Sequence, residues 1–295
     1  MLSLPFATAG LTARITAHKA KVPRLAPAVL ILCAAACATS PLGRDQLILF
    51  PDDQIAQMGV TAYQELKDST PVTTNREVNG YVKCVADELI RALDPAVSEG
   101  DEGTDQWEVS VFADDQVNAF ALPGGKIGVY QGLLSVAENQ DQLATVVAHE
   151  IAHVLSRHSN ERISTQYATS TGLELASAVA GQATPVKQTL FGLLGVGAQV
   201  GILLPFSRSQ ESEADLVGLE LMAKAGFDPR QSVNLWRNMI AEGGGEGGDT
   251  PPEFLSTHPS GESRIRALEE TMPKVLPLVE QARAGGRQPD CGEAG

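Results

Sequence analysis

The sequence predicts an α+β fold that is mainly helical and contains a small sheet. Apolar residues recur at helical spacing in several segments. The clearest such stripe consists of Val78, Val82, Val85, Leu89 and Leu93. WEVSVF at residues 107–112 alternates between apolar and polar side chains, which is typical of a strand with one buried face. Two short strands are expected on either side of Pro123-Gly124-Gly125, a sequence that favours a turn.

Helices are predicted in order along the chain from periodicity and from start and stop signals. They cover residues 53–68, 76–93, 141–157, 209–224, 229–241 and 260–272. The fourth stops at Gly226, and Asp228-Pro229 caps the fifth. Residues 94–106 and 243–252 are expected to be loops. The weakly charged run 170–204 indicates closely packed helices or, alternatively, a surface that meets lipid or apolar substrate.

The chain is acidic, with a net charge of −14. The first 36 residues contain four basic side chains and no acid, so the remainder carries a net charge of −18. Such a body repels the phosphates of nucleic acids and of anionic membranes. The composition therefore excludes a function based on a basic patch, and no nucleic-acid partner is expected.

The N-terminus has the features of a targeting segment. Basic residues precede LAPAVLILCAAAC, an apolar run that is too short for a membrane span and has the form of a secretory signal. Small residues before Cys37 predict a lipoprotein-type signal over residues 1–36, with Cys37 as the lipidated residue. The alternative is an ordinary signal peptide with an incidental cysteine.

The rest of the chain is expected to fold as one domain between two extended segments. Residues 37–52 are predicted to be a tether, residues 53–283 the folded domain, and residues 284–295 a flexible tail. Cys84 and Cys291 could pair in an oxidising compartment, although a buried free thiol at Cys84 is an equal alternative.

The stretch VVAHEIAHVLSRH at residues 146–158 places polar side chains inside an apolar helix. His149 and His153 lie four residues apart, so their side chains project side by side and can bind one Zn²⁺. Glu150, beside the first ligand, is placed to take a proton from an attacking water, as in the H-E-x-x-H motif. Metal binding would offset the cost of burying these groups. The alternative is a solvated helix face with coincidental histidines.

A catalytic zinc needs a third protein ligand. The later segment ESEAD supplies Glu211 and Asp215, four residues apart on one predicted helix. Glu211 is a candidate ligand, and Asp215 could orient a histidine ligand through a hydrogen bond to its far nitrogen. The alternatives are Glu213 as the ligand and an acidic face exposed to solvent.

Four segments, HEIAH, ESEAD, NAFALPGGKIGVYQGLL and STHPSGESRI, resemble the membrane-associated zinc metallopeptidases related to the CAAX prenyl protease and HtpX. The similarity is greatest to the periplasmic lipoprotein branch of BepA- and LoiP-like peptidases, and it covers roughly residues 37–272. The resemblance implies a zincin-type metallopeptidase domain over residues 53–283 that holds one Zn²⁺. The chain ends soon after its last predicted helix, so the helical-repeat (TPR) domain of longer members is not expected.

Carried over residue by residue, the resemblance implies roles for the residues of the two helical motifs. It implies ligands at His149, His153 and Glu211, a general base at Glu150, and a supporting acid at Asp215.

The resemblance also assigns residues outside these helices. Asn118, Ala119 and Phe120 match an edge strand that pairs with an extended peptide, whereas the alternative is an ordinary hairpin. His258 matches a histidine that approaches the metal and either stabilises the oxyanion or blocks the water site. Arg208 and His158 are interpreted more simply, as a partner for local acids and as a residue at the end of a helix.

The predicted function is zinc-dependent endopeptidase cleavage of misfolded or unassembled cell-envelope proteins. The predicted location is the periplasm, with a lipid anchor at Cys37 in the inner leaflet of the outer membrane. Two alternatives stay open: a periplasmic chaperone or assembly factor with latent proteolysis, and a protein with a purely structural zinc. Glu150 argues against the second, because a closed structural site has no use for a general base.

Overall fold

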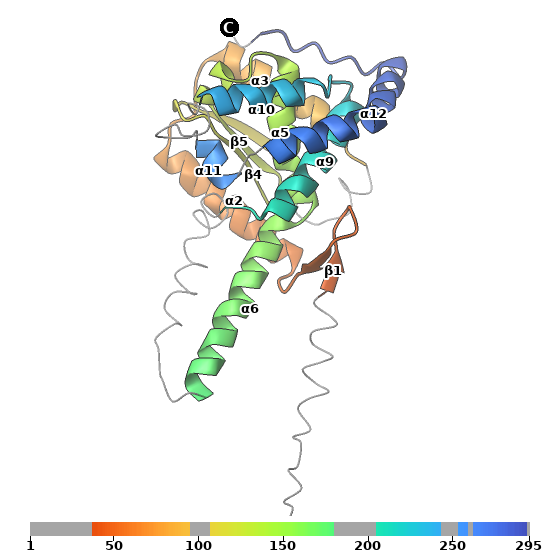
Figure 1. Cartoon of the computed structure of the whole chain (residues 1–295). Helices are drawn as coiled ribbons and strands as arrows, with labels where there is room; N and C mark the ends of the chain where they lie inside the picture. The colour runs from red at the N-terminus through yellow and green to blue at the C-terminus, as the bar shows by residue number, and fades with distance from the viewer. Residues whose placement is uncertain (1–36, 95–106, 180–204, 243–252, 259–261, 294–295) are drawn as a thin grey trace, which may run out of the picture. The chain divides into compact units, whose positions relative to one another are not determined.

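The structure, a computed structural model, describes residues 37–94, 107–179, 205–242, 253–258 and 262–293. All of these belong to the unit that begins at Cys37. The predicted signal segment 1–36 lies outside the described residues, as do residues 180–204 and nearly all of the two predicted loops. The predicted α+β fold, mainly helical with a small sheet, is confirmed (Figure 1).

The main sheet has the strand order β3–β5–β4. Its strands are β3 (Glu108–Phe112), β4 (Ala119–Leu122) and β5 (Lys126–Tyr130). β4 and β5 pair antiparallel as the predicted hairpin, whereas β3 is parallel to β5. The turn between β4 and β5 contains Gly124 and Gly125 at φ 84° and 69°, a left-handed backbone that glycine adopts without strain. β4 is therefore an edge strand of this sheet.

Five predicted helices are present within a few residues of their expected bounds. They are α2 (Asp52–Ser69), α3 (Arg76–Arg91), α5 (Gln140–Leu155), α9 (Arg208–Ala225) and α10 (Gln231–Glu242). Their ends follow local chemistry: Asn139 caps α5, Ser207 forms a capping box with Gln210 on α9, and α9 stops at Gly226 with φ 94°. The further helices are η1 (Gln131–Ser135), α6 (His158–Val179), α11 (Glu253–Thr257) and α12 (Glu262–Ala284).

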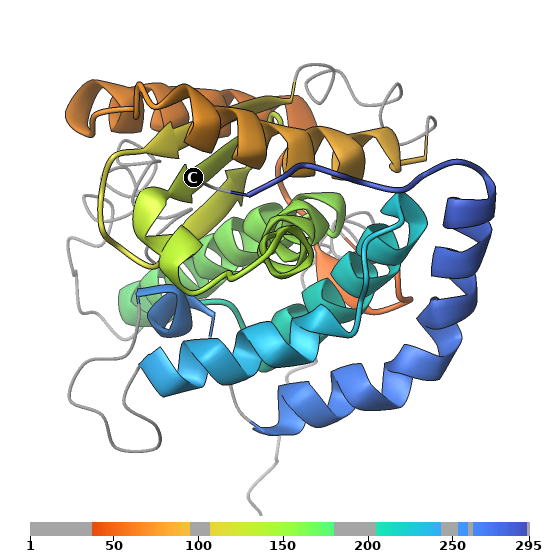
Figure 2. The ribbon, with the colours of Figure 1, turned by 90° about the horizontal axis from the view of Figure 1, so that it is seen from above.

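α5 lies at the centre of the hydrophobic core. It packs against α9, α3, α10 and strand β4, and every residue from Gln142 to His153 is buried (Figure 2). A helix can be buried on all sides only if its surface is nearly all apolar, which explains the run of Leu, Ala and Val around the histidines. Gly218 allows α9 to approach, because a Cβ there would lie 3.0 Å from the backbone of Ala148 and His149.

The predicted tether over residues 37–52 is wrong. Residues Cys37–Thr39 and Asp45–Leu47 form an antiparallel hairpin, β1–β2, that packs against the domain. Arg44 forms ion pairs with Glu161 and Glu213, and the buried side chain of Gln46 donates to the carbonyl of Ser156 at 2.7 Å. These partners lie over a hundred residues away in sequence, so local composition gave no sign of them. Lipidation of Cys37 stays a prediction.

The predicted flexible tail, residues 284–295, also makes specific contacts with the folded domain. Cys291 forms a disulfide with Cys84 of α3 and packs against the hydrophobic core. The side-chain amide of Gln140 forms two hydrogen bonds with the backbone of this segment. It accepts from Cys291 N and donates to the carbonyl of Pro289. The sequence left two alternatives for Cys84, a disulfide with Cys291 or a buried free thiol, and the structure contains the disulfide.

α12 continues beyond the position at which the sequence predicts its end. The prediction stopped the helix before Pro273, because proline removes a backbone hydrogen bond at a cost of about 3 kcal/mol. The helix instead runs through Pro273 and Pro277 and curves along its length (Figure 2). Val275 and Val279 are buried and Arg283 donates to the carbonyl of Gly226, so tertiary contacts offset the loss.

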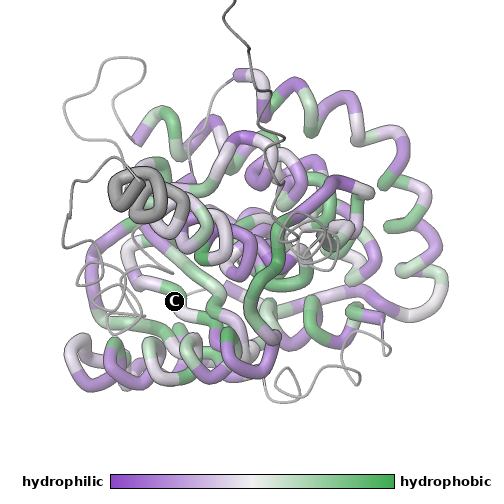
Figure 3. The backbone as a smooth tube through the Cα atoms, turned by 90° about the horizontal axis from the view of Figure 1, so that it is seen from below, coloured by the Kyte–Doolittle hydropathy of each residue, from purple (hydrophilic) through white to green (hydrophobic). Residues whose placement is uncertain are grey.

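Hydropathy along the backbone shows where each helix faces the core. Hydrophilic and hydrophobic residues alternate along α12 (Figure 3), as expected for a helix with one buried side. Among the described residues, no helix has the length and apolar character needed to cross a bilayer.

Candidate active site

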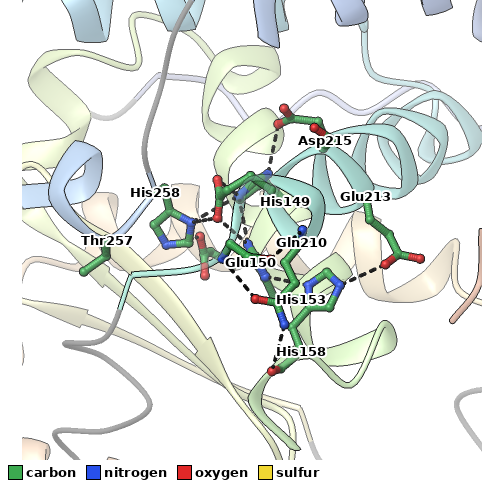
Figure 4. Close-up of polar contacts among 12 residues, drawn as sticks. His149, Glu150, His153, His158, Gln210, Glu213, Asp215, Thr257 and His258 are labelled. Atoms are coloured by element: carbon green, nitrogen blue, oxygen red, sulfur yellow. Dashed lines mark hydrogen bonds and ion pairs between the residues drawn. The ribbon is translucent and has the colours of Figure 1, made fainter. Parts of the chain in front are cut away.

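Three side chains of α5 and one of α9 converge inside the domain (Figure 4). His149 and His153 lie one turn apart, and their Nε2 atoms are 3.0 Å from each other. Glu211, in the first turn of α9, places its carboxylate oxygens 3.5 Å from His149 Nε2 and 3.4 Å from His153 Nε2. Glu150 lies beside them, and all four are at most 2% exposed.

His258 follows α11 and lies in the same cluster. Its Nδ1 is 3.2 Å from His149 Nε2 and 3.0 Å from Glu211 Oε1. One ligand atom from each of His149, His153, Glu211 and His258 lies within 4.8 Å of the others, which is the size of a mononuclear metal site. The structure thus brings together the three predicted ligands and the histidine predicted to approach the metal.

The protonation pattern of the cluster fits a cation. His149 Nδ1 is 3.1 Å from Asp215 Oδ1, and a carboxylate only accepts hydrogen bonds, so Nδ1 carries a proton and Nε2 is free to bind a cation. Burial lowers the pKa of His149, but hydrogen bonds to Asp215 and Glu211 raise it to about 9. The pocket therefore attracts positive charge when it holds no metal. Imidazole nitrogens with one carboxylate are a donor set that suits Zn²⁺.

Glu150 differs from the candidate ligands in its surroundings. One carboxylate oxygen accepts from the backbone N–H of Ala121 on β4 at 3.2 Å, and the other lies 3.4 Å from His258 Nε2. Burial raises the pKa of the Glu150 carboxyl, although the nearby histidines oppose the shift. A carboxylate with a raised pKa is suited to accept a proton near neutral pH.

Asp215 and Arg264 contact the candidate ligands His149 and Glu211 and hold them in place. Asp215 bonds the far nitrogen of His149, as its position on the helix predicts. Arg264 of α12 forms ion pairs with Asp215 at 2.6 Å and with Glu211 at 2.7 Å, and its guanidinium lies over the ring of Trp236. Sequence reasoning missed Arg264, which belongs to the STHPSGESRI segment, because no local pattern connects it with residues 49 positions earlier.

The predicted substrate strand lies beside Glu150. Some of its groups face the sheet and the core, and others face the open edge. The carbonyl of Asn118 accepts from Tyr130 N, and the Phe120 ring packs among Tyr63, Phe112 and Tyr130. The Phe120 ring therefore belongs to the core, and the assignment of this strand to substrate binding stays a prediction. The N–H groups of Ala119 and Ala121 point to the open edge, where they meet the Asn118 side chain and Glu150.

Three further residues considered in the sequence lie outside the cluster of candidate ligands. Glu213 turns away from the candidate ligands toward the β1–β2 hairpin, so it is no competitor for the third ligand position. Arg208 is exposed at the start of α9, whereas the guanidinium of Arg162 on α6 lies over the Phe206 ring. Burial lowers the pKa of Arg162 to about 10. His158 lies just past the end of α5, as the sequence interpretation has it, and is fully buried there.

A central helix with H-E-x-x-H, a glutamate from a second helix and a short sheet beside it define a metallopeptidase of the zincin class. The family model of peptidase family M48 matches residues 77–272, more than half of the chain. The chain belongs to peptidase family M48.

Similar proteins come from eukaryotes and bacteria. The mitochondrial metalloendopeptidase OMA1 of Schizosaccharomyces pombe is 43% identical over 58% of this chain and 48% of its own length. OMA1 of Saccharomyces cerevisiae is 35% identical over 68% of this chain and 55% of its own. The β-barrel assembly-enhancing protease of Escherichia coli is 28% identical over 78% of this chain and 46% of its own. The chain thus spans about half the length of these relatives.

The comparisons contradict the predicted location. Relatives that are 35–43% identical, from fission yeast, Arabidopsis and budding yeast, are named as mitochondrial proteins, so a periplasmic, outer-membrane location is not supported. The prediction relied on a basic, acid-free N-terminus followed by an apolar run and by small residues before Cys37. The first of these features is common to secretory signals and to mitochondrial transit peptides. Membership of the wider family is shown, whereas membership of the lipoprotein branch is not.

Proposed function

We propose that this chain is a zinc-dependent metalloendopeptidase. His149, His153 and Glu211 would hold one Zn²⁺, and Glu150 would act as the general base. The observation that carries the proposal is the convergence of two lone-pair nitrogens and a carboxylate at 3.0–3.5 Å, beside a buried Glu150 that is not one of the cluster's ligands. Zinc is favoured over Mg²⁺ or Ca²⁺ because those ions prefer oxygen ligands alone.

The chemistry follows from the positions of the chain's own groups. A bound Zn²⁺ supplies a Lewis acid that polarises the scissile carbonyl and lowers the pKa of water. Glu150 accepts the proton of the attacking water and delivers it to the leaving amine, and its raised pKa suits both steps. Asp215 holds the His149 ring so that Nε2 faces the cluster.

The open edge of β4 is the proposed binding site for substrate. An extended peptide can pair with the outward N–H and carbonyl groups of Ala119 and Ala121 whatever its own side chains. Ala121 N lies 3.2 Å from Glu150 Oε2, so a peptide on this edge would have its backbone beside the general base. Binding through the backbone suits unfolded or unassembled chains, which we propose as substrates. The E. coli relative is named for enhancing β-barrel assembly, which favours unassembled β-barrel proteins among them.

His258 is proposed to control access. Its Nδ1 lies among the candidate ligands, 3.2 Å from His149 Nε2 and 3.0 Å from Glu211 Oε1, so it would be a fourth ligand, and its Nε2 faces Glu150. In this arrangement His258 blocks the position of the attacking water, and it must move for cleavage. His258→Ala should then increase peptide cleavage while zinc stays bound. An unchanged rate together with unchanged zinc content would contradict this role.

The first test is digestion of unfolded casein by the zinc-loaded chain beginning at Cys37, next to Glu150→Gln. Cleavage by the first and not by the second supports the peptidase. Equal cleavage by both would contradict Glu150 as the base.

A chaperone with latent proteolysis is the second candidate. The four-residue cluster favours it, because a site closed by His258 would bind chains without cutting them. Activity of Glu150→Gln in preventing aggregation of an unfolded protein would support this candidate.

A further inference from the structure

The two histidines of the cluster are supported by different residues. His149 is backed by Asp215 directly. Behind His153 lies a second histidine: His153 Nδ1 is 2.8 Å from His158 Nδ1, and His158 Nε2 is 3.1 Å from Glu213 Oε2 (Figure 4). His153, His158 and Glu213 are all at most 4% exposed, so no bulk water competes for these hydrogen bonds.

We propose that His158 and Glu213 position His153 and fix the proton on its Nδ1, so that its Nε2 faces the metal. This inference rests on the proposed function, because it takes His153 to be a metal ligand. His158 and Glu213 touch neither the metal position nor the substrate edge, so they act as positioning residues and not as catalytic ones.

The direction of the hydrogen bonds between Glu213, His158 and His153 follows from the ionisation of Glu213. Glu213 accepts from the backbone N–H of Leu42 and from the guanidinium of Arg44, so it is a carboxylate. A carboxylate only accepts, hence His158 Nε2 donates to it. The neutral ring of the buried His158 then has Nδ1 as its acceptor nitrogen. His153 Nδ1 must then be the donor.

The backbone and the packing hold this geometry. The chain reverses between α5 and α6 at Arg157, whose φ of 54° is uncommon for a residue with a side chain and brings His158 back beneath His153. The Phe206 ring lies 3.7 Å from the His153 ring at 30°, so it restrains the imidazole from one face. A strained turn is retained when the surrounding structure requires it.

The chain of contacts ends on the β1–β2 hairpin. Arg44 donates through Nε to Glu213 and forms two bonds with Glu161, at 2.5 and 2.6 Å. The hairpin therefore fixes the carboxylate that holds His158. This gives the N-terminal hairpin a part in the metal site, although it lies more than a hundred residues from His153 in sequence.

The test compares two replacements of His158 in the full chain. His158→Phe keeps the ring volume and removes the acceptor, whereas the Oδ1 of His158→Asn reaches about the position of Nδ1. We expect zinc affinity, measured by competition with a chelator, to fall about 10–100-fold in His158→Phe and much less in His158→Asn. In the metal-free protein, ¹⁵N shifts of the His153 ring should report a proton on Nδ1 that is lost to Nε2 in His158→Phe.

Asn160→Ala is the control for packing. It removes buried hydrogen bonds to Phe50 and Asp52 in the same turn of α6 and contacts no candidate ligand, so it should lower stability and leave zinc affinity unchanged. If His158→Phe does not fold, Glu213→Gln, which preserves volume, takes its place and should show a smaller loss of affinity.

The outcomes separate the two proposals. A folded His158→Phe, or Glu213→Gln in its place, that binds zinc as tightly as the wild type and keeps the same ring shifts would overturn the positioning role. Failure of the wild type to bind zinc, or equal casein cleavage by Glu150→Gln, would instead overturn the proposed function.

Discussion

Replacing Arg264 by Met should destabilise the metal-free protein far more than the zinc-loaded one. Arg264 is 6% exposed and forms ion pairs with Asp215 and Glu211, which are themselves buried. Methionine keeps much of the apolar contact with Trp236 but leaves two buried carboxylates without their cation. Removing one partner of a buried pair costs about 3–5 kcal/mol. Zinc would restore positive charge beside Glu211, so part of this loss should disappear when metal is bound.

The assay is thermal and urea unfolding of both proteins with chelator and with excess zinc. For a domain of this size, about 2–4 °C is expected per kcal/mol, so the midpoint should fall by about 6–20 °C without metal. Arg266→Met is the matched control, because Arg266 lies on the same helix and makes only an exposed pair with Glu262, worth about 1 kcal/mol or less. A metal-free Arg264→Met within about 1 kcal/mol of wild type would refute the reasoning.

Three further predictions concern packing, the disulfide and pH. Gly218→Ala should push α9 from α5, lower stability by about 1–3 kcal/mol in urea unfolding and weaken zinc binding, whereas Gly80→Ala, whose Cβ would meet nothing within 4 Å, should not weaken it. Reducing the Cys84–Cys291 disulfide should cost about 2–5 kcal/mol, seen as a lower calorimetric midpoint; an unchanged midpoint after verified reduction would contradict this. Hydrogen bonds from two lysines hold the pKa of Glu108 below 4.5, so its stabilisation is full above pH 4.5 and declines below it. Glu108→Gln should flatten that decline in acid unfolding curves, and an identical acid transition would count against it.

The sequence predicted the features whose causes are local. Helix periodicity and the stop at Gly226 each depend on residues within about one turn, and the structure contains both. The H-E-x-x-H spacing is also local, because one turn of helix places His149 and His153 side by side. The ESEAD segment left Glu211 and Glu213 as alternative third ligands, and only the resemblance selected Glu211, since the distance of this segment from α5 in sequence carries no geometric information.

The sequence by itself determined the α+β class, most of the long helices, the strands of the main sheet and the chemistry of the candidate site, because these follow from short-range spacing and side-chain type. Only the tertiary structure decided which charges meet: Arg264 behind Glu211, His158 and Glu213 behind His153, and the hairpin around Arg44. It also decided the paired cysteines and the continuation of α12 through two prolines. Contacts between distant segments stabilise each of these, and such contacts form only when the whole chain packs.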